Sequence, residues 1–288
     1  EIIVVDDGST DSSVDVLKTF GDRIKWIQQK NSGPGAARNA GFSASTGDYI
    51  QFFDSDDLMT PNKLEVQASL LDENKEADFA YGPYVMAEET DDGWEQRDVI
   101  LQYSPLPEKP LHEVVAKGWC TITQSCLFRR ATLERAGAWR TDLMTHEDKE
   151  YWYRIGEVVK HAAHERRSCV FYRQHGVQIT NKQTAANDRT KDGIHAFDLI
   201  IDQLKRDHVS FLTASICKGI RAGYIKYLIS KDDFTFRNSW RNEVYYFLYR
   251  IYQKAGRIIT QTNWQPADGP LDRPETFEHF KSMLNELR

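Results

Sequence analysis

The sequence predicts an α/β fold with a mostly parallel, Rossmann-like central sheet, helices on both of its faces, and a helical C-terminal region. In the first half, short apolar runs alternate with helical patterns, as parallel sheets with covered faces require. Acidic or glycine-containing clusters follow several of these runs, where open α/β sheets bind ligands. Beyond about residue 182 the spacing is helical throughout. We therefore expect a catalytic-type domain over residues 1–180 and a helical extension over residues 181–288.

The predicted elements follow from apolar spacing and from glycine, proline and capping residues. The strands are Ile2–Val5, Ile24–Gln28, Tyr49–Phe53, Asp78–Tyr81 and Gln124–Phe128. The helices are Ser12–Phe20, Gly35–Ser45, Pro61–Asn74, Leu111–Lys117, Arg130–Ala136, Glu147–Gly156, Arg189–Asp207, Ser210–Ser230 and Ser239–Thr260. Thr60 is predicted to cap the helix that starts at Pro61. The polar turn Glu88–Gly93 is typical of a β-hairpin.

Composition limits the function classes. The chain has 288 residues, enough for a sizeable core. Its net charge of −6 argues against a nucleic-acid partner, which favours a basic surplus. It shows no run of 18 apolar residues and no signal-peptide pattern, so we expect a cytoplasmic location. Its four cysteines form no CxxC pair and are expected to be reduced thiols.

Asp6 and Asp7 follow the first apolar run, and Gly8 permits a tight turn after them. A carboxylate at the end of a buried parallel strand lies where such sheets bind ligands, and it can accept a hydrogen bond from a uracil N–H or from ribose hydroxyls. The alternative is that both carboxylates cap the next helix.

The run Gly33–Arg38 nearly matches the GxGxxG dinucleotide fingerprint, but Arg38 stands where the last glycine would be. That glycine allows close packing of helix on strand, so a dinucleotide fold is not expected. Arg38 has two open roles, which are offsetting the charge of a diphosphate and forming a structural ion pair.

Three carboxylates, Asp54, Asp56 and Asp57, fall within four residues of an apolar strand. Like charges this close are unfavourable unless solvent or a cation screens them. A hard divalent ion with oxygen ligands, Mg²⁺ or Mn²⁺, is the natural partner. The alternative is an ordinary acidic turn.

Glu147 and Asp148 begin a predicted helix, where the positive end of the dipole stabilises carboxylates. They are either a catalytic pair or ordinary acids of a first helical turn. His175 follows a predicted strand, and it is either a metal or diphosphate contact or a structural histidine.

In order and spacing, the segments Glu1–Asp11, Gly33–Gly41, Gly47–Asp57, Thr145–Arg154 and Phe171–His175 resemble the family 2 glycosyltransferases, which have the GT-A fold. The resemblance covers residues 1–180. It implies metal-dependent transfer of a sugar, with inversion, from a nucleoside-diphosphate sugar, expected to be UDP-linked, to an acceptor hydroxyl. It also implies that the chain lacks the first strand and helix of that family.

The resemblance further implies three groups of site residues. Donor binding falls to Asp7, with Asp6 in a supporting role, and to Arg38, Asp54 and Ser55; the metal falls to Asp56 and His175; and catalysis falls to Asp148 as general base, supported by Glu147.

The predicted helix Ser239–Thr260 mixes aromatic and basic side chains. Such a helix can lie on an anionic membrane surface or pack on its own domain. With a saccharide or lipid-linked saccharide as acceptor, we expect peripheral contact at the inner face of the membrane, in bacterial-type polysaccharide synthesis.

Two other classes remain open. One is a non-catalytic nucleotide-sugar-binding or scaffold protein on the same fold. The other is a nucleotidyltransferase, although the glycine- and basic-rich N-terminal signature of that class is not visible.

Overall fold

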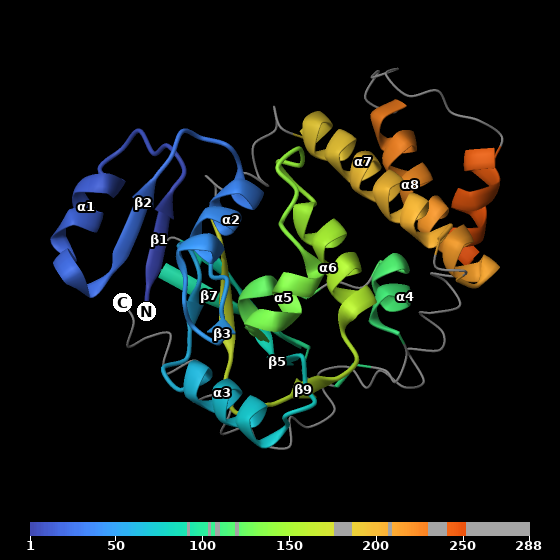
Figure 1. Cartoon of the computed structure of the whole chain (residues 1–288). Coiled ribbons are helices and arrows are strands. Elements are labelled where there is room, and N and C mark those ends of the chain that lie inside the picture. Colours follow the sequence, from blue (N-terminus) through green and yellow to red (C-terminus); the bar gives the residue numbers. More distant parts are fainter. Residues whose placement is uncertain are drawn as a thin grey trace.

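The computed structural model describes residues 1–90, 93–102, 105–106, 110–118, 121–175, 186–206, 209–229 and 241–251. Figure 1 shows an α/β part in blue to yellow and a group of helices in gold to red beside it. The expected boundary at residue 180 lies outside the described residues.

The described strands form three hydrogen-bonded sets. β1 (Ile3–Asp6) pairs with β2 (Lys25–Gln28). The second set has the order β3 (Tyr49–Ile50), β8 (Cys126–Arg129), β5 (Phe79–Tyr81) and β9 (Ala162–His164). The third has the order β4 (Leu58–Met59), β10 (Val170–Gln174), β6 (Tyr84–Thr90) and β7 (Gly93–Leu101). β6 and β7 form the expected hairpin.

The expectation of a mostly parallel sheet is wrong for the described strands. β1–β2, β5–β9 and β6–β10 are parallel, whereas β3–β8, β5–β8, β4–β10 and β6–β7 are antiparallel. Because β3 and β5 are both antiparallel to β8, and β9 is parallel to β5, strands β3, β5 and β9 share one direction. The hairpin and α4 separate β5 from β8, and β8 then enters between β3 and β5 in the reverse direction.

Each predicted helix has a counterpart in the described residues. They are α1 (Ser13–Thr19), α2 (Pro34–Ala44), α3 (Lys63–Glu73), α4 (Leu111–Ala116), α5 (Arg130–Ala136), α6 (Glu147–Val158), α7 (Ala186–Leu204) and α8 (Phe211–Ile229), with residues 241–251 also helical. Short 3₁₀ turns lie at Gly21–Arg23, before β2, and at Thr123–Ser125, before β8. Gln124 lies in the second turn and not in the strand, which begins at Cys126.

The predicted cap of α3 is wrong. The helix begins at Lys63 after Asn62, which makes no side-chain cap hydrogen bond. The hydroxyl of Thr60 instead accepts a hydrogen bond from Cys169 N at 3.2 Å, because Thr60 lies beside the segment that enters β10. The Thr60 hydroxyl, which the local sequence assigns to the helix cap, is therefore used in a tertiary hydrogen bond.

The main core lies between the β3–β8–β5–β9 sheet and α6. Three consecutive aromatic residues of α6, Tyr151, Trp152 and Tyr153, are buried there. Gly156 allows α4 to approach α6, since a Cβ on it would lie 2.4 Å from His112 N. This packing fixes the direction of α6 and with it the position of its N-terminal carboxylates. Among the described helices, none is both long and apolar enough to cross a bilayer.

Candidate active site

The acidic segment after β3 gathers three carboxylates. One oxygen from each of Asp54, Asp56 and Asp57 lies within 4.8 Å of the others. The side-chain amide of Gln124 donates to Asp54 Oδ2 at 2.5 Å and to Asp57 Oδ2 at 2.9 Å. Ser55 is exposed in the turn between them. The cluster offers several carboxylate oxygens in one place, which is the donor set that Mg²⁺ and Mn²⁺ prefer.

Asp57 is the buried member of the acidic cluster. Burial, together with the neighbouring charges of Asp56 and Asp54, raises the pKa of Asp57 to about 7. The backbone N–H of Arg173, on β10, donates to Asp57 Oδ1 at 3.0 Å and opposes that rise. The cluster is therefore short of positive charge, which favours a cation beside it.

His175 lies directly after β10, and its Nε2 is 3.3 Å from Asp56 Oδ2. The structure thus brings together Asp56 and His175, the two residues predicted from sequence to hold a metal. They come from positions 119 residues apart, and the sheet pairing of β10 with β4 and β6 aligns them.

Arg38, on α2, joins the acidic cluster to the N-terminus of α6. Its guanidinium donates to Asp54 Oδ1 at 3.1 Å and to Glu147 Oε1 at 2.7 Å, and it lies over the Trp139 ring at 4.6 Å. Of its two roles, the ion pair is therefore present in the structure. Contact with a diphosphate stays a proposal.

Glu147 and Asp148 begin α6, as predicted. Glu147 is buried, and burial with the nearby charge of Asp148 raises the pKa of Glu147 despite the ion pair with Arg38. Asp148 is half-buried, and its Oδ1 accepts a hydrogen bond from Lys149 N at 2.8 Å.

Tyr172, on β10, shows that these carboxylates share one region. Burial raises the pKa of Tyr172 to about 12, and the charges of the acidic cluster and of Asp148 add to that rise. The Arg38 ion pairs with Asp54 and Glu147 hold the two acidic segments, separated by about 90 positions in the chain, in this region.

Asp6 accepts a hydrogen bond from the turn after β1, and Asp7 accepts hydrogen bonds from the segment after β2. Asp7 accepts hydrogen bonds from Gln29 Nε2 at 2.7 Å, and from the backbone N–H groups of Ser32 and Gly33, each at 2.8 Å. Asp6 is buried and accepts from Ser9 N and from Gln28 Nε2, each at 3.2 Å. Asp7 thus holds the turn that leads into α2, and its contact with a base stays a prediction.

Sequence reasoning did not identify Gln124 or Trp139. Gln124 bridges two carboxylates and Trp139 underlies Arg38, yet neither belongs to a motif with fixed spacing. A glutamine before an apolar run is the only local signal for Gln124, and it does not specify a partner 70 residues earlier.

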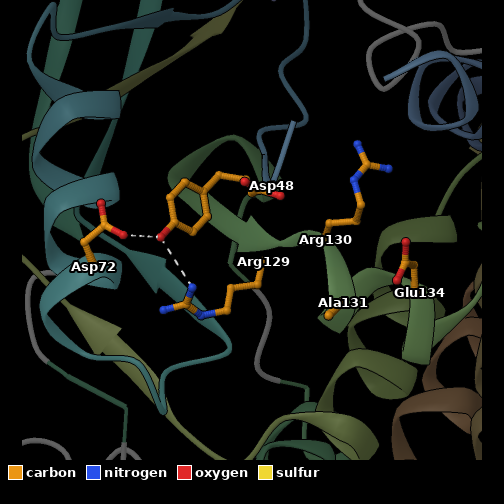
Figure 2. A pocket seen from close by; sticks show the side chains of 7 residues that line it. Asp48, Asp72, Arg129, Arg130, Ala131 and Glu134 are labelled. Carbon is orange, nitrogen blue, oxygen red and sulfur yellow. Dashed lines mark hydrogen bonds between the residues drawn. The ribbon is translucent and has the colours of Figure 1, made fainter. Parts of the chain in front are cut away.

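A separate groove opens at the other end of β3, around Tyr49 (Figure 2). Its polar groups bind one another, since the Tyr49 hydroxyl donates to Asp72 at 2.7 Å and receives a hydrogen bond from Arg129 at 3.3 Å. Arg130 donates to Gly47 O and to Ser45 Oγ, each at 2.8 Å. The groove holds none of the predicted site residues.

The chain is similar to known glycosyltransferases. The model of the family described as "Glycosyl transferase family 2" matches residues 1–137. An uncharacterised glycosyltransferase of Rickettsia conorii is 46% identical over 76 residues, 26% of this chain and 13% of that protein. EpsH of Bacillus subtilis is 30% identical over 192 residues, 63% of this chain and 54% of EpsH. The chain therefore spans at most about half the length of these relatives.

The fold has a counterpart among solved structures. TarS of S. aureus in complex with UDP-GlcNAc superposes with a TM-score of 0.52 and 16% identity, over 85% of this chain and 69% of that one. The α/β fold is that of the GT-A glycosyltransferases. Residues 1–137 form a glycosyl transferase family 2 domain. Asp6, Asp7, Arg38 and the acidic cluster lie within the range, whereas the α6 carboxylates and His175 lie beyond it.

Proposed function

We propose that the chain transfers a sugar from a nucleoside-diphosphate sugar to an acceptor hydroxyl with inversion, and that Asp148 is the general base. The observation that carries this proposal is the Arg38 bridge, which holds the acidic cluster at Asp54 against Glu147. This bridge supports the proposal because it joins the acidic cluster to the helix start that carries the partly buried Asp148. A base must reach the acceptor proton, and Asp148 starts a helix that is fixed by buried aromatic packing.

The residues present fit a divalent cation. Three carboxylates converge, one of them with a pKa raised by burial and by its like-charged neighbours, and His175 lies against Asp56. Asp56 and His175 would hold Mg²⁺ or Mn²⁺. When bound, the ion would offset negative charge on the departing diphosphate. Asp54 and Ser55 would contact the ribose, and Arg38 would supply a fixed positive charge next to the diphosphate.

UDP is the nucleotide that we propose for the donor. TarS, which shares the fold, has been crystallised with UDP and with UDP-GlcNAc, which makes these two compounds suitable first probes. Asp7 would meet the base, and Asp6 would support the turn. The hydrogen bonds from Ser32 N and Gly33 N hold Asp7, at the end of β1, against the segment that leads to Arg38.

For the acceptor, we propose a saccharide or lipid-linked saccharide at the inner face of the membrane, with the C-terminal helices in peripheral contact. Residues 241–251 carry four exposed apolar side chains at helical spacing, Val244, Phe247, Leu248 and Ile251. That spacing gives one apolar face. We expect co-sedimentation with anionic phospholipid vesicles at low salt, weakened by Phe247→Ser and unchanged by Val16→Ser, an exposed apolar control on α1. Absence of sedimentation at low salt contradicts this contact.

The decisive experiment combines binding and turnover. Calorimetric titration of UDP is expected to show binding with Mn²⁺ and weak binding with EDTA, and Asp56→Ala should weaken the Mn²⁺-dependent part. With UDP-GlcNAc, Asp148→Asn should retain UDP binding and lower UDP release by roughly 10²- to 10⁴-fold. Asp188→Asn, an exposed carboxylate of α7, is the matched control. Near-normal turnover by Asp148→Asn refutes the base assignment, and UDP binding without turnover of any donor favours the non-catalytic scaffold.

A further inference from the structure

The segment that leads into α6, residues 140–146, is bound by α7. The carboxylate oxygen Oδ2 of Asp192 accepts hydrogen bonds from Met144 N at 3.2 Å, from Thr145 N at 2.9 Å and from Thr145 Oγ1 at 3.1 Å. Two residues before that contact, Asp142 Oδ2 lies 3.1 Å from Nε2 of His195, also on α7. In Figure 1 this green segment rises from the α5–α6 region to the side of α7.

The last residue of this segment is held by α8. His146 has a left-handed backbone with φ of 62° and stands directly before Glu147. Its Nε2 lies 3.0 Å from the hydroxyl of Tyr224, and the two rings meet edge to face at 5.4 Å. A non-glycine residue keeps a left-handed conformation only where its surroundings determine it strongly. This turn fixes where α6 starts, and so where Asp148 lies.

The opposite side of the same segment contacts α2. A Cβ on Gly35 would lie 2.1 Å from Arg140 O, and a Cβ on Gly33 would lie 2.8 Å from Met144 Sδ. Residues 140–146 are thus packed between the helix that carries Arg38 and the two C-terminal helices α7 and α8. If the contacts with α7 and α8 were lost, residues 140–146 would still be held by α2 on one side but could move on the other.

We infer that Asp192 and Tyr224 are positioning residues for the general base Asp148, so that the helical C-terminal region forms part of the catalytic apparatus. This inference rests on the proposed function. The Asp192 carboxylate and the Tyr224 hydroxyl are polar groups outside the apolar cluster of Ile194, Ile225 and Leu228 that joins α7 to α8, and it is the Tyr224 ring that packs against this cluster. Removing one hydroxyl or one carboxylate should therefore loosen the turn at residues 144–146 and leave the helices packed.

The first test is hydrogen exchange on the full chain. Asp192→Ala removes the acceptor of the Met144 and Thr145 amides, so these amides should exchange roughly tenfold faster, whereas Asp192→Asn, whose amide oxygen still accepts, should restore part of the protection. Tyr224→Phe keeps the ring and should speed exchange at the start of α6. The controls are Asp202→Asn, an exposed carboxylate of α7 paired with Lys205, and Tyr227→Phe, 42% exposed on α8. Unchanged exchange at residues 144–148 in Asp192→Ala and Tyr224→Phe overturns the inference.

The second test separates positioning from folding. With UDP-GlcNAc and Mn²⁺, Asp192→Ala and Tyr224→Phe should lower kcat by roughly 10- to 100-fold and leave the donor KM, the UDP affinity and the melting temperature close to those of the wild type. Asp192→Asn should recover part of kcat. Normal kcat in both variants, with an active wild type and an inactive Asp148→Asn, overturns the inference alone. An inactive wild type, or an active Asp148→Asn, overturns the proposed function, and the exchange measurement still decides whether the turn is held.

Discussion

Arg38 joins the two acidic segments of the site through two ion pairs. Arg38→Met removes both ion pairs and keeps an apolar contact with Trp139. The magnitude follows from the two ion pairs. The Asp54 side chain is 41% exposed, and an exposed pair contributes about 0–1 kcal/mol. The Glu147 side chain is 10% exposed, and breaking a buried pair costs about 3–5 kcal/mol because a charge is left without compensation. We expect a loss of about 3–5 kcal/mol in the free energy of unfolding near pH 8.

The loss of stability caused by Arg38→Met should depend on pH. Burial and Asp148 raise the pKa of Glu147 even with Arg38 in place, and removing the cation raises it further. A carboxyl group with a raised folded pKa favours folding most below its unfolded pKa, about 4.3, and that stability is lost as the pH rises through the folded pKa. Protonated Glu147 carries no charge that Arg38 would need to compensate. The loss in the free energy of unfolding caused by Arg38→Met should therefore shrink to about 1 kcal/mol near pH 5.

Urea unfolding of wild type and variant at about pH 5 and pH 8, followed by tryptophan fluorescence, measures both values. Arg140→Met is the matched control, because Arg140 pairs with Asp142 at the surface and should cost less than about 1 kcal/mol at either pH. In the background of Glu147→Gln, Arg38→Met should lose most of its effect. Equal losses at the two pH values, or a loss under 1 kcal/mol at pH 8, refute the reasoning.

Three other perturbations test the rest of the site. Gly35→Ala should destabilise the protein by about 1–3 kcal/mol in thermal unfolding, because its Cβ would meet a backbone carbonyl. The control is Gly41→Ala on the same helix, whose Cβ would make an ordinary 3.4 Å contact and which should be neutral or stabilising. Equal effects of the two substitutions contradict this view. Asp57→Asn should raise the melting temperature of the metal-free protein near pH 8, since it removes a buried charge, and should reduce the shift produced by Mn²⁺. Gln124→Leu should lower stability by about 1–3 kcal/mol with Mn²⁺ restoring part of it, and an undiminished loss in Mn²⁺ speaks against a cation at the cluster.

The order of the helices and of most strands could be predicted because it depends on local periodicity, whereas the short strands β4 and β9 were not predicted. The buried aromatic face of α6 and the apolar runs of β3, β5 and β8 carry that signal in the sequence itself. The position of β8 between β3 and β5 could not be predicted. Between β5 and β8 the chain passes through the hairpin and α4, and it then rejoins the sheet in the opposite direction. No short sequence pattern indicates the direction in which a strand joins a sheet.

The site was predictable as a set of motifs but not as a set of contacts. The segments that carry Asp54, Glu147 and His175 were recognisable, yet the pairing of Arg38 with Glu147, 109 residues away, was not. Arg38 could reach any of several acids on the basis of charge alone. Packing of α2 against the turn at Trp139, where Asn39 exchanges two hydrogen bonds of 2.8 Å with the backbone, selects the partner.

The near match of Gly33–Arg38 to a dinucleotide fingerprint has a different physical cause. In the fingerprint, glycine lets the backbone approach a pyrophosphate. Here Gly35 lets the carbonyl of Arg140 approach α2, and Gly33, with φ of 88°, presents its N–H to Asp7. One helical turn later, Arg38 extends to both acidic segments. The glycines thus bring the turn before α6 close enough to α2 for a single arginine to pair with both acidic segments, and this packing accounts for the near match to the fingerprint.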